Sequence, residues 1–140
     1  MQQQTSGYSG APLAKKLGIK PGFNVALINA PDHYLNLFTD MPGDIAFVDA
    51  SADQIDLIHF FTKQKEEYNS LLPNLKKRIK SNGIIWISWP KKASKVITDI
   101  TEDTIRNYAL QIGLVDIKVC AVDEIWSGLK LVIPVKDRTI

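Results

Sequence analysis

The chain has 140 residues, of which 45% are hydrophobic and 23% are charged, and its formal net charge is +2. This composition excludes a disordered chain or a charged arm, and the length is sufficient to bury a hydrophobic core in one domain without disulfides or metals. A net charge this small argues against a general nucleic-acid-binding protein, which concentrates basic residues on one face.

The N-terminal residues indicate where the protein resides. The first ten, MQQQTSGYSG, contain neither the basic nor the apolar stretch of a secretory signal. The longest unbroken apolar runs have four residues, whereas a membrane-spanning helix needs about 20. We therefore expect a cytoplasmic protein with no membrane partner. The single cysteine, Cys120, fits a reducing compartment and lies between apolar neighbours, as a small core residue would.

The first half of the chain alternates helical and strand patterns. It predicts a short helix at 9–18, a strand at 23–29, a helix that begins at Pro31 and runs towards 41–43, and strands at 45–48 and 55–61. Ser9 can cap the first helix and Gly18 can end it. Residues 1–8 are expected to be flexible. The strand at 23–29 is apolar on both faces, which is typical of the middle of a parallel sheet.

The second half continues the alternation. It predicts a helix that Thr62 caps and Asn82-Gly83 ends, a strand at 84–89, a helix between Thr101 and Gly113, and strands at 114–122 and 129–135. Pro73 should kink or split the first of these helices. In the strand at 114–122, Val115, Ile117 and Val119 are expected on the drier face. The last two strands are expected to form an antiparallel hairpin.

This order of elements predicts one domain over residues 1–140. Helices that alternate with apolar strands give a three-layer α/β sandwich of the Rossmann-like type, with a mostly parallel sheet and a C-terminal antiparallel hairpin.

Several segments are similar to class I S-adenosylmethionine (SAM)-dependent methyltransferases. They are LGIKPG at 17–22, FVDAS at 47–51, IDLI at 55–58, the helix before Asn82-Gly83, and the terminal hairpin. The resemblance covers nearly the whole chain and implies a shortened methyltransferase-type fold without the usual third strand and its helix. It also implies SAM as an alternative cofactor, with Asp49 in the place where that family holds the ribose hydroxyls.

Three further segments resemble recurring strings of a family of small bacterial proteins defined by a domain of unknown function. They are SGYSG at 6–10, WISWPKK at 86–92 and WSGLK at 126–130. This second resemblance implies no activity.

The turn after the first strand differs from the methyltransferase pattern. It reads Asn29-Ala30-Pro31, which has no glycine, and Pro31 has no amide hydrogen to donate. Our main prediction is therefore a non-catalytic binding module without an assigned cofactor. The alternatives are a SAM-dependent methyltransferase with an altered cofactor turn, and a protein-interaction or homodimerisation domain that uses the terminal hairpin.

Ligands of open α/β sheets bind at the carboxyl ends of the strands. The residues predicted there, or in the hairpin connection, are Asn29, Asp32, His33, Asp49, Trp89, Lys91, Lys92 and Trp126. Trp89 could stack on a flat ligand while the two lysines hold phosphate or carboxylate, so the predicted partner is a small anionic or nucleotide-like molecule. The alternative, which we favour, is that Trp89 packs in the core and the lysines are solvated.

Other polar residues have structural interpretations beside functional ones. Asp32 and His33 could act as acid and base, but adjacent helical residues do not face each other, so Asp32 is expected to stabilise a helix start and His33 to be exposed. His59 is either buried and hydrogen-bonded or catalytic. We assign no catalytic residue, and two histidines with one cysteine, widely spaced, do not make a metal site.

Two remaining features concern macromolecular partners. The basic cluster at 76–80 could contact nucleic acid, but it is explained more simply by the negative end of a helix. Trp126 in the hairpin connection is either an exposed binding or dimerising aromatic, or it packs against Trp86 or Trp89.

Overall fold

A computed structural model of the chain describes residues 12–138. Its helices are α1 (Leu13–Leu17), α2 (Lys65–Arg78) and α3 (Glu102–Gln111), with short 3-10 helices η1 (Tyr34–Leu37), η2 (Lys92–Ser94) and η3 (Val135–Asp137). Its strands are β1 (Asn24–Ile28), β2 (Ala46–Phe47), β3 (Ile55–Phe61), β4 (Ile79–Pro90), β5 (Val115–Ala121) and β6 (Trp126–Val132). The predicted flexibility of residues 1–8 and the predicted cap at Ser9 lie outside the described residues.

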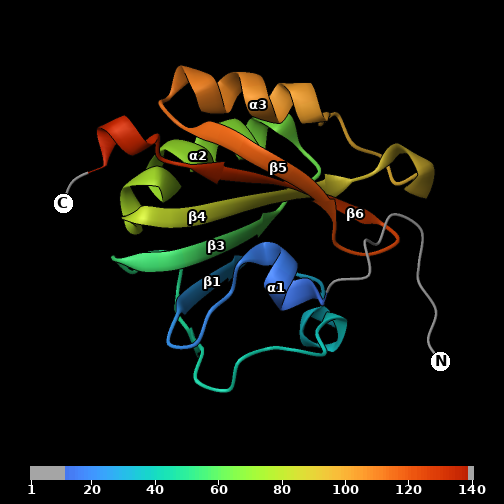
Figure 1. The fold of residues 1–140 in the computed structure, drawn as a ribbon. Helices are drawn as coiled ribbons and strands as arrows, with labels where there is room; N and C mark the ends of the chain where they lie inside the picture. The colour runs from blue at the N-terminus through green and yellow to red at the C-terminus, as the bar shows by residue number, and fades with distance from the viewer. Residues whose placement is uncertain (1–11, 139–140) are drawn as a thin grey trace.

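All six strands belong to one sheet in the order β2-β1-β3-β4-β6-β5 (Figure 1). The first four strands of this order run parallel, β6 is antiparallel to β4, and β5 is antiparallel to β6. This confirms the Rossmann-like α/β fold with a mostly parallel sheet and an antiparallel C-terminal pair. The chain goes from β1 to β2 on one side and then to β3 on the other, so the order reverses between β1 and β3.

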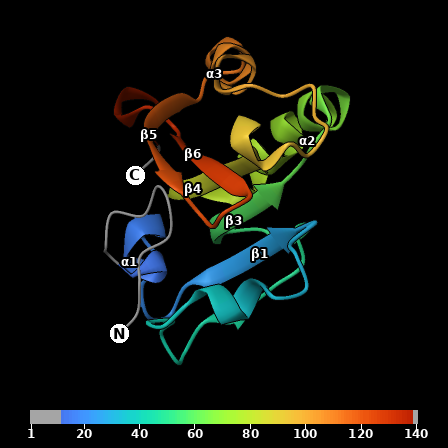
Figure 2. The same cartoon turned by 90° about the vertical axis from the view of Figure 1, so that its right-hand side faces the viewer.

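Helices lie on both faces of the sheet (Figure 2). On one face, α2 and α3 cover a core that includes Ile58, Leu72 and Ile105, all fully buried. On the other face, α1 packs over Leu57 and Trp86. Within residues 12–138, no helix combines the length and the apolarity that a membrane crossing requires.

The helix predicted to begin at Pro31 is wrong, because η1 is a four-residue 3-10 helix. Its hydrogen bonds join residues three apart, from the Tyr34 amide to the Pro31 carbonyl and from the Asn36 amide to the His33 carbonyl. The sequence places Tyr34, Leu35 and Phe38 on one apolar side of this helix, but in the structure Tyr34 is buried while Leu35 is 56% exposed. Leu37 and Phe38 are partly buried against the core.

The helix after β3 also differs from its prediction at both ends. Its N-cap is Gln64 rather than Thr62, and the helix runs through Pro73 without splitting and ends at Arg78. Ile79 is already in β4 and pairs with Ile55, after which the register shifts. Gly83 lies in this irregular part of the strand, where a Cβ atom would be 2.8 Å from the Ile79 Cβ. The glycine therefore permits a close approach within a strand and does not end the helix.

The C-terminal elements confirm α3 and correct β5 and β6. The Thr101 hydroxyl accepts a hydrogen bond from the Thr104 amide at 3.1 Å, as predicted for the cap. Ile117 and Val119 are 54% and 46% exposed, not on a dry face, because β5 is the outer strand and its register shifts between Asp116 and Lys118. Trp126 is the first residue of β6 rather than part of a connection.

The indole of Trp86 fixes the end of α1 to the sheet. It is fully buried, and its Nε1–H donates to the Leu17 carbonyl at 2.8 Å. Trp86→Phe should lower the free energy of unfolding by about 2–4 kcal/mol, because it leaves a cavity and an unpaired buried carbonyl. Urea denaturation measures this change. Phe47→Leu, at a side chain 47% exposed, is the control and should change it by less than about 0.5 kcal/mol.

Candidate functional site

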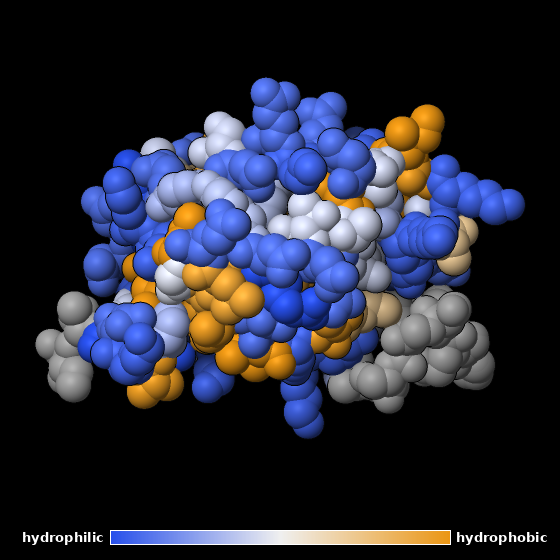
Figure 3. All heavy atoms as spheres, turned by 90° about the horizontal axis from the view of Figure 1, so that it is seen from above, coloured by the Kyte–Doolittle hydropathy of each residue, from blue (hydrophilic) through white to orange (hydrophobic). Residues whose placement is uncertain are grey.

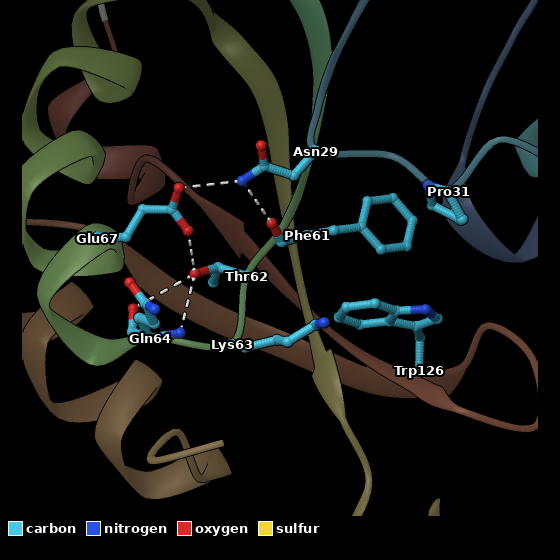
Figure 4. Close-up of a pocket in the computed structure, with 8 residues that line it drawn as sticks. All are labelled: Asn29, Pro31, Phe61, Thr62, Lys63, Gln64, Glu67 and Trp126. Carbon is cyan, nitrogen blue, oxygen red and sulfur yellow. Dashed lines mark hydrogen bonds between the residues drawn. The ribbon is translucent and has the colours of Figure 1, made fainter. Parts of the chain in front are cut away.

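A hollow of about 470 Å³ lies at the carboxyl ends of β1 and β3 (Figure 4). We call it the switch-point hollow, because it lies where the strand order reverses. Its lining residues are Asn29, Pro31, Phe61, Thr62, Lys63, Gln64, Glu67 and Trp126. Open α/β sheets bind their ligands at this position, since the connections from neighbouring strands diverge there. The fold therefore makes this hollow the first candidate for a ligand site.

One wall of the switch-point hollow is polar and hydrogen-bonded. Glu67, from the first turn of α2, accepts a bond from the Thr62 hydroxyl at 2.6 Å through Oε1. Through Oε2 it accepts a bond from the Asn29 side-chain amide at 3.1 Å. The same amide group donates to the Phe61 carbonyl at 3.1 Å. These bonds hold a carboxylate in a defined orientation between the ends of two strands.

The opposite wall is apolar and aromatic (Figure 4). The rings of Phe61 and Trp126 meet edge to face with their centroids 5.1 Å apart, and Pro31 lies beside them. The ammonium of Lys63 points towards the Trp126 indole in the same view. Such a combination of flat apolar surface and a few oriented polar groups is typical of small-molecule sites.

A buried hydrogen-bond network lies behind the aromatic wall. His59 Nδ1 is 2.9 Å from the Tyr34 hydroxyl, and His59 Nε2 is 2.8 Å from the Ser88 hydroxyl. The imidazole also stacks on Phe61 at 4.2 Å between centroids. Burial lowers the pKa of His59 to about 3 and raises the pKa of Tyr34. His59 is therefore a neutral, hydrogen-bonded histidine that supports Phe61 from inside the core.

The backbone at Asn29 has a conformation that glycine usually provides. Its φ is +58°, in the left-handed region, where asparagine is the most tolerated of the larger residues. The turn after β1 thus obtains a glycine-like bend while the asparagine side chain bonds to Glu67. The absence of a glycine at this turn does not prevent the bend.

The structure places two of the predicted site residues, Asn29 and Trp126, in the switch-point hollow. Asp32 and His33 are exposed in the following turn, and His33 Nε2 lies 3.6 Å from Asp123 Oδ2. Asp32 does not begin an α-helix, so its expected helix-stabilising role is wrong.

Asp49 lies two residues beyond β2 and is exposed. Its Oδ1 atom accepts bonds from the hydroxyl and the amide of Ser51, at 2.6 and 2.8 Å, which lowers the pKa of the carboxyl.

Trp89, Lys91 and Lys92 lie elsewhere, around a second hollow of about 640 Å³ between the end of β4 and the start of α3. We call it the lysine hollow. The Trp89 side chain is packed in the core, with the residue 8% exposed, so little of its indole is accessible for stacking. The residues predicted to form one site are therefore divided, with Asn29 and Trp126 in the switch-point hollow and Trp89, Lys91 and Lys92 in the lysine hollow.

The sequence interpretation missed Phe61, Lys63, Gln64 and Glu67 as lining residues. Phe61 was predicted only as part of a strand, and Glu67 was not singled out. The signal that could have found them is position, because Phe61 ends a strand beside the reversal of strand order and Glu67 lies in the first turn of the helix that follows. Within residues 12–138, no cluster of histidine, cysteine, aspartate and glutamate is suited to a metal ion.

Three of the four basic residues at 76–80 contact other parts of the fold. Lys76 Nζ donates to the Ile112 carbonyl at the end of α3, at 2.8 Å. Arg78 pairs with Asp53 at 2.7 Å and Lys80 with Asp56 at 3.0 Å. These contacts agree with a structural role at the end of α2.

Solved structures of methyltransferases share this fold. A proposed type 11 methyltransferase from Sulfolobus solfataricus has a TM-score of 0.65 at 13% identity, over 91% of this chain and 93% of that one. A SAM-dependent methyltransferase from Aquifex aeolicus has a TM-score of 0.63 at 16% identity, over 85% and 86%. Aeropyrum pernix fibrillarin with natively bound SAM has a TM-score of 0.57 at 14% identity, over 85% and 72%. No family model and no curated protein matches the chain. The chain therefore has a methyltransferase-type fold.

The buried network makes stability depend on pH. Above the ordinary histidine pKa of 6.5, His59 is neutral in both states; below it, protons bind the unfolded state alone until the folded value of about 3 is reached. The folded state should therefore become less stable as the pH is lowered. Between pH 7 and pH 5, His59 accounts for a loss of about 2 kcal/mol in the free energy of unfolding.

Urea denaturation at several pH values tests this on variants of the two histidines. His59→Gln should flatten the dependence relative to the unsubstituted protein, whereas His33→Gln, at a half-exposed side chain, should retain it. If the free energy of unfolding depended on pH equally in the His59 variant and in the unsubstituted protein, His59 would be protonated in the folded state, contrary to this prediction.

Proposed function

We propose that the chain binds SAM in the switch-point hollow and acts as a SAM-dependent methyltransferase. The observation that carries this proposal is the position of the hollow, at the reversal of strand order in a methyltransferase-type sheet. The fold neighbours support it, since the fibrillarin structure is described with bound SAM, and so is a magnesium protoporphyrin IX methyltransferase from Synechocystis with a TM-score of 0.58.

The residues present fit this cofactor. The left-handed backbone of Asn29 gives the turn after β1 the bend for which the family uses glycine. Asp49 has an exposed carboxylate beyond β2, at the position where the resemblance places the ribose hydroxyls, and Ser51 occupies only its Oδ1 atom. Phe61 and Trp126 offer apolar surface to the rest of the molecule.

Each wall of the hollow has a separate task in this proposal. SAM supplies a methyl group on a positively charged sulfur. Glu67, which Thr62 and Asn29 hold in place, provides fixed negative charge that favours a cationic ligand. The aromatic wall excludes water from the opposite side. No residue is assigned as a general base.

A second candidate function is binding without methyl transfer. Pro31 has no amide hydrogen, and η1 is too short to direct a helix N-terminus at a ligand. Both observations favour a hollow that holds a small cationic or nucleoside-like molecule and performs no reaction on it.

Calorimetric titration with SAM tests the proposal. Glu67→Gln should weaken binding by about tenfold, because it removes the charge and disturbs the bonds to Thr62 and Asn29. Asp49→Ala should weaken it by a similar factor if the ribose hydroxyls bind there. Glu66→Gln is the matched control, since it makes the same change in an exposed neighbour on the same helical turn; it should leave the affinity unchanged.

The two candidate functions give different results in a second measurement. Release of S-adenosylhomocysteine from SAM in a cell extract, lost in the Glu67 variant, supports the methyltransferase. Binding without release supports the module. No binding of SAM to the unsubstituted protein would contradict the proposal.

A further inference from the structure

The lysine hollow has positive charge along its lining. Lys91, Lys92 and Lys95 lie along its lining, and none of them forms an ion pair among residues 12–138. One acidic residue, Glu102, also lines the hollow, and its carboxylate pairs with Arg106. The Asp99 carboxylate accepts a hydrogen bond from the Lys65 amide at 2.7 Å.

Apolar residues line the same hollow. Ile97, on the same loop, is 91% exposed, and Trp89, which is 8% exposed, also belongs to the lining. Hydrophobic and hydrophilic side chains stand next to one another at the side of the molecule where the 91–99 loop lies (Figure 3). Ile97 contributes almost nothing to the core, so its apolar surface is available to a ligand.

The loop that carries these groups is held in place by its own hydrogen bonds. The Ser94 hydroxyl donates to the Lys91 carbonyl at 2.7 Å, and the Thr98 hydroxyl donates to the Lys63 carbonyl at 2.6 Å. The lysines and Ile97 therefore project from a defined backbone beside the switch-point hollow, which Lys63 also lines. A ligand would find positive charge and apolar surface already arranged.

We propose that the lysine hollow binds a small amphipathic anion, a molecule with an apolar or aromatic body and a phosphate, sulfonate or carboxylate group. The ammonium groups complement the anion, and Ile97 with the accessible part of Trp89 contacts the body. The volume of about 640 Å³ is that of a small-molecule site rather than of an extended nucleic-acid surface. This proposal does not depend on SAM binding.

Anilinonaphthalene sulfonate, an aromatic sulfonate whose fluorescence rises in apolar surroundings, is a suitable probe. We expect saturable binding to the folded protein that weakens with salt, as binding to ammonium groups does. The triple variant Lys91→Gln, Lys92→Gln, Lys95→Gln should bind the probe with an affinity at least about tenfold lower. Ile97→Ser should also weaken it, with circular dichroism showing that each variant is folded.

The matched control is a triple variant with the same loss of charge at exposed lysines outside the hollow, Lys15→Gln, Lys20→Gln, Lys118→Gln. It should change the probe affinity by less than about twofold, and Glu67→Gln should not change it. Equal losses in the two triple variants would overturn the proposal, because they would show an effect of net charge alone. Binding to anionic phospholipid vesicles but not to the probe would overturn it in favour of a membrane surface.

Discussion

The pairing of β3 with β1 on one side and β4 on the other is the constraint on which the rest of the structure depends. Six of the seven residues of β3 are buried, and they reach the core on both faces of the sheet. Because the three strands are parallel, their carboxyl ends meet at one edge. The connections that leave this edge supply Asn29, the Phe61-Thr62 pair and the loop after Trp89. Both hollows are therefore consequences of one strand arrangement.

The molecule keeps this arrangement with few covering elements. A single turn of 3-10 helix follows β1, and the connection from β2 to β3 contains no helix. Tyr34 helps to close the face that α1 also covers, because it reaches His59, and His59 in turn reaches Ser88 on β4. The network replaces helix packing with buried hydrogen bonds, which are strong only while every partner is present. It also supports the aromatic wall, so the stability of this face and the shape of the switch-point hollow are linked through Phe61.

The sequence predicted the fold better than the site. The apolar run at 55–61 and the cap at Thr101 were sufficient to place β3 and α3, since burial and capping act locally. Sequence patterns failed where distant partners decide the structure. Ile79 leaves the helix because it pairs with Ile55, and Ile117 is exposed because β5 is the outer strand. Glu67 enters the site only through its bonds to Asn29 and Thr62, which no spacing along the chain reveals.

The two hollows differ in the charge of their lining residues, and this difference separates the ligands proposed for them. The switch-point hollow presents a held carboxylate, whereas the lysine hollow presents lysines that form no ion pair within the described part of the chain, residues 12–138. A fold can keep its shape while its function changes, so the chemistry of these walls decides the activity. A crystal structure of the protein with S-adenosylhomocysteine tests the central claim most directly. The account predicts the nucleoside against Asp49 and the aromatic wall, with the amino-acid group near Glu67. Crystals grown with saturating ligand that show it bound at another surface, or not bound, would contradict it.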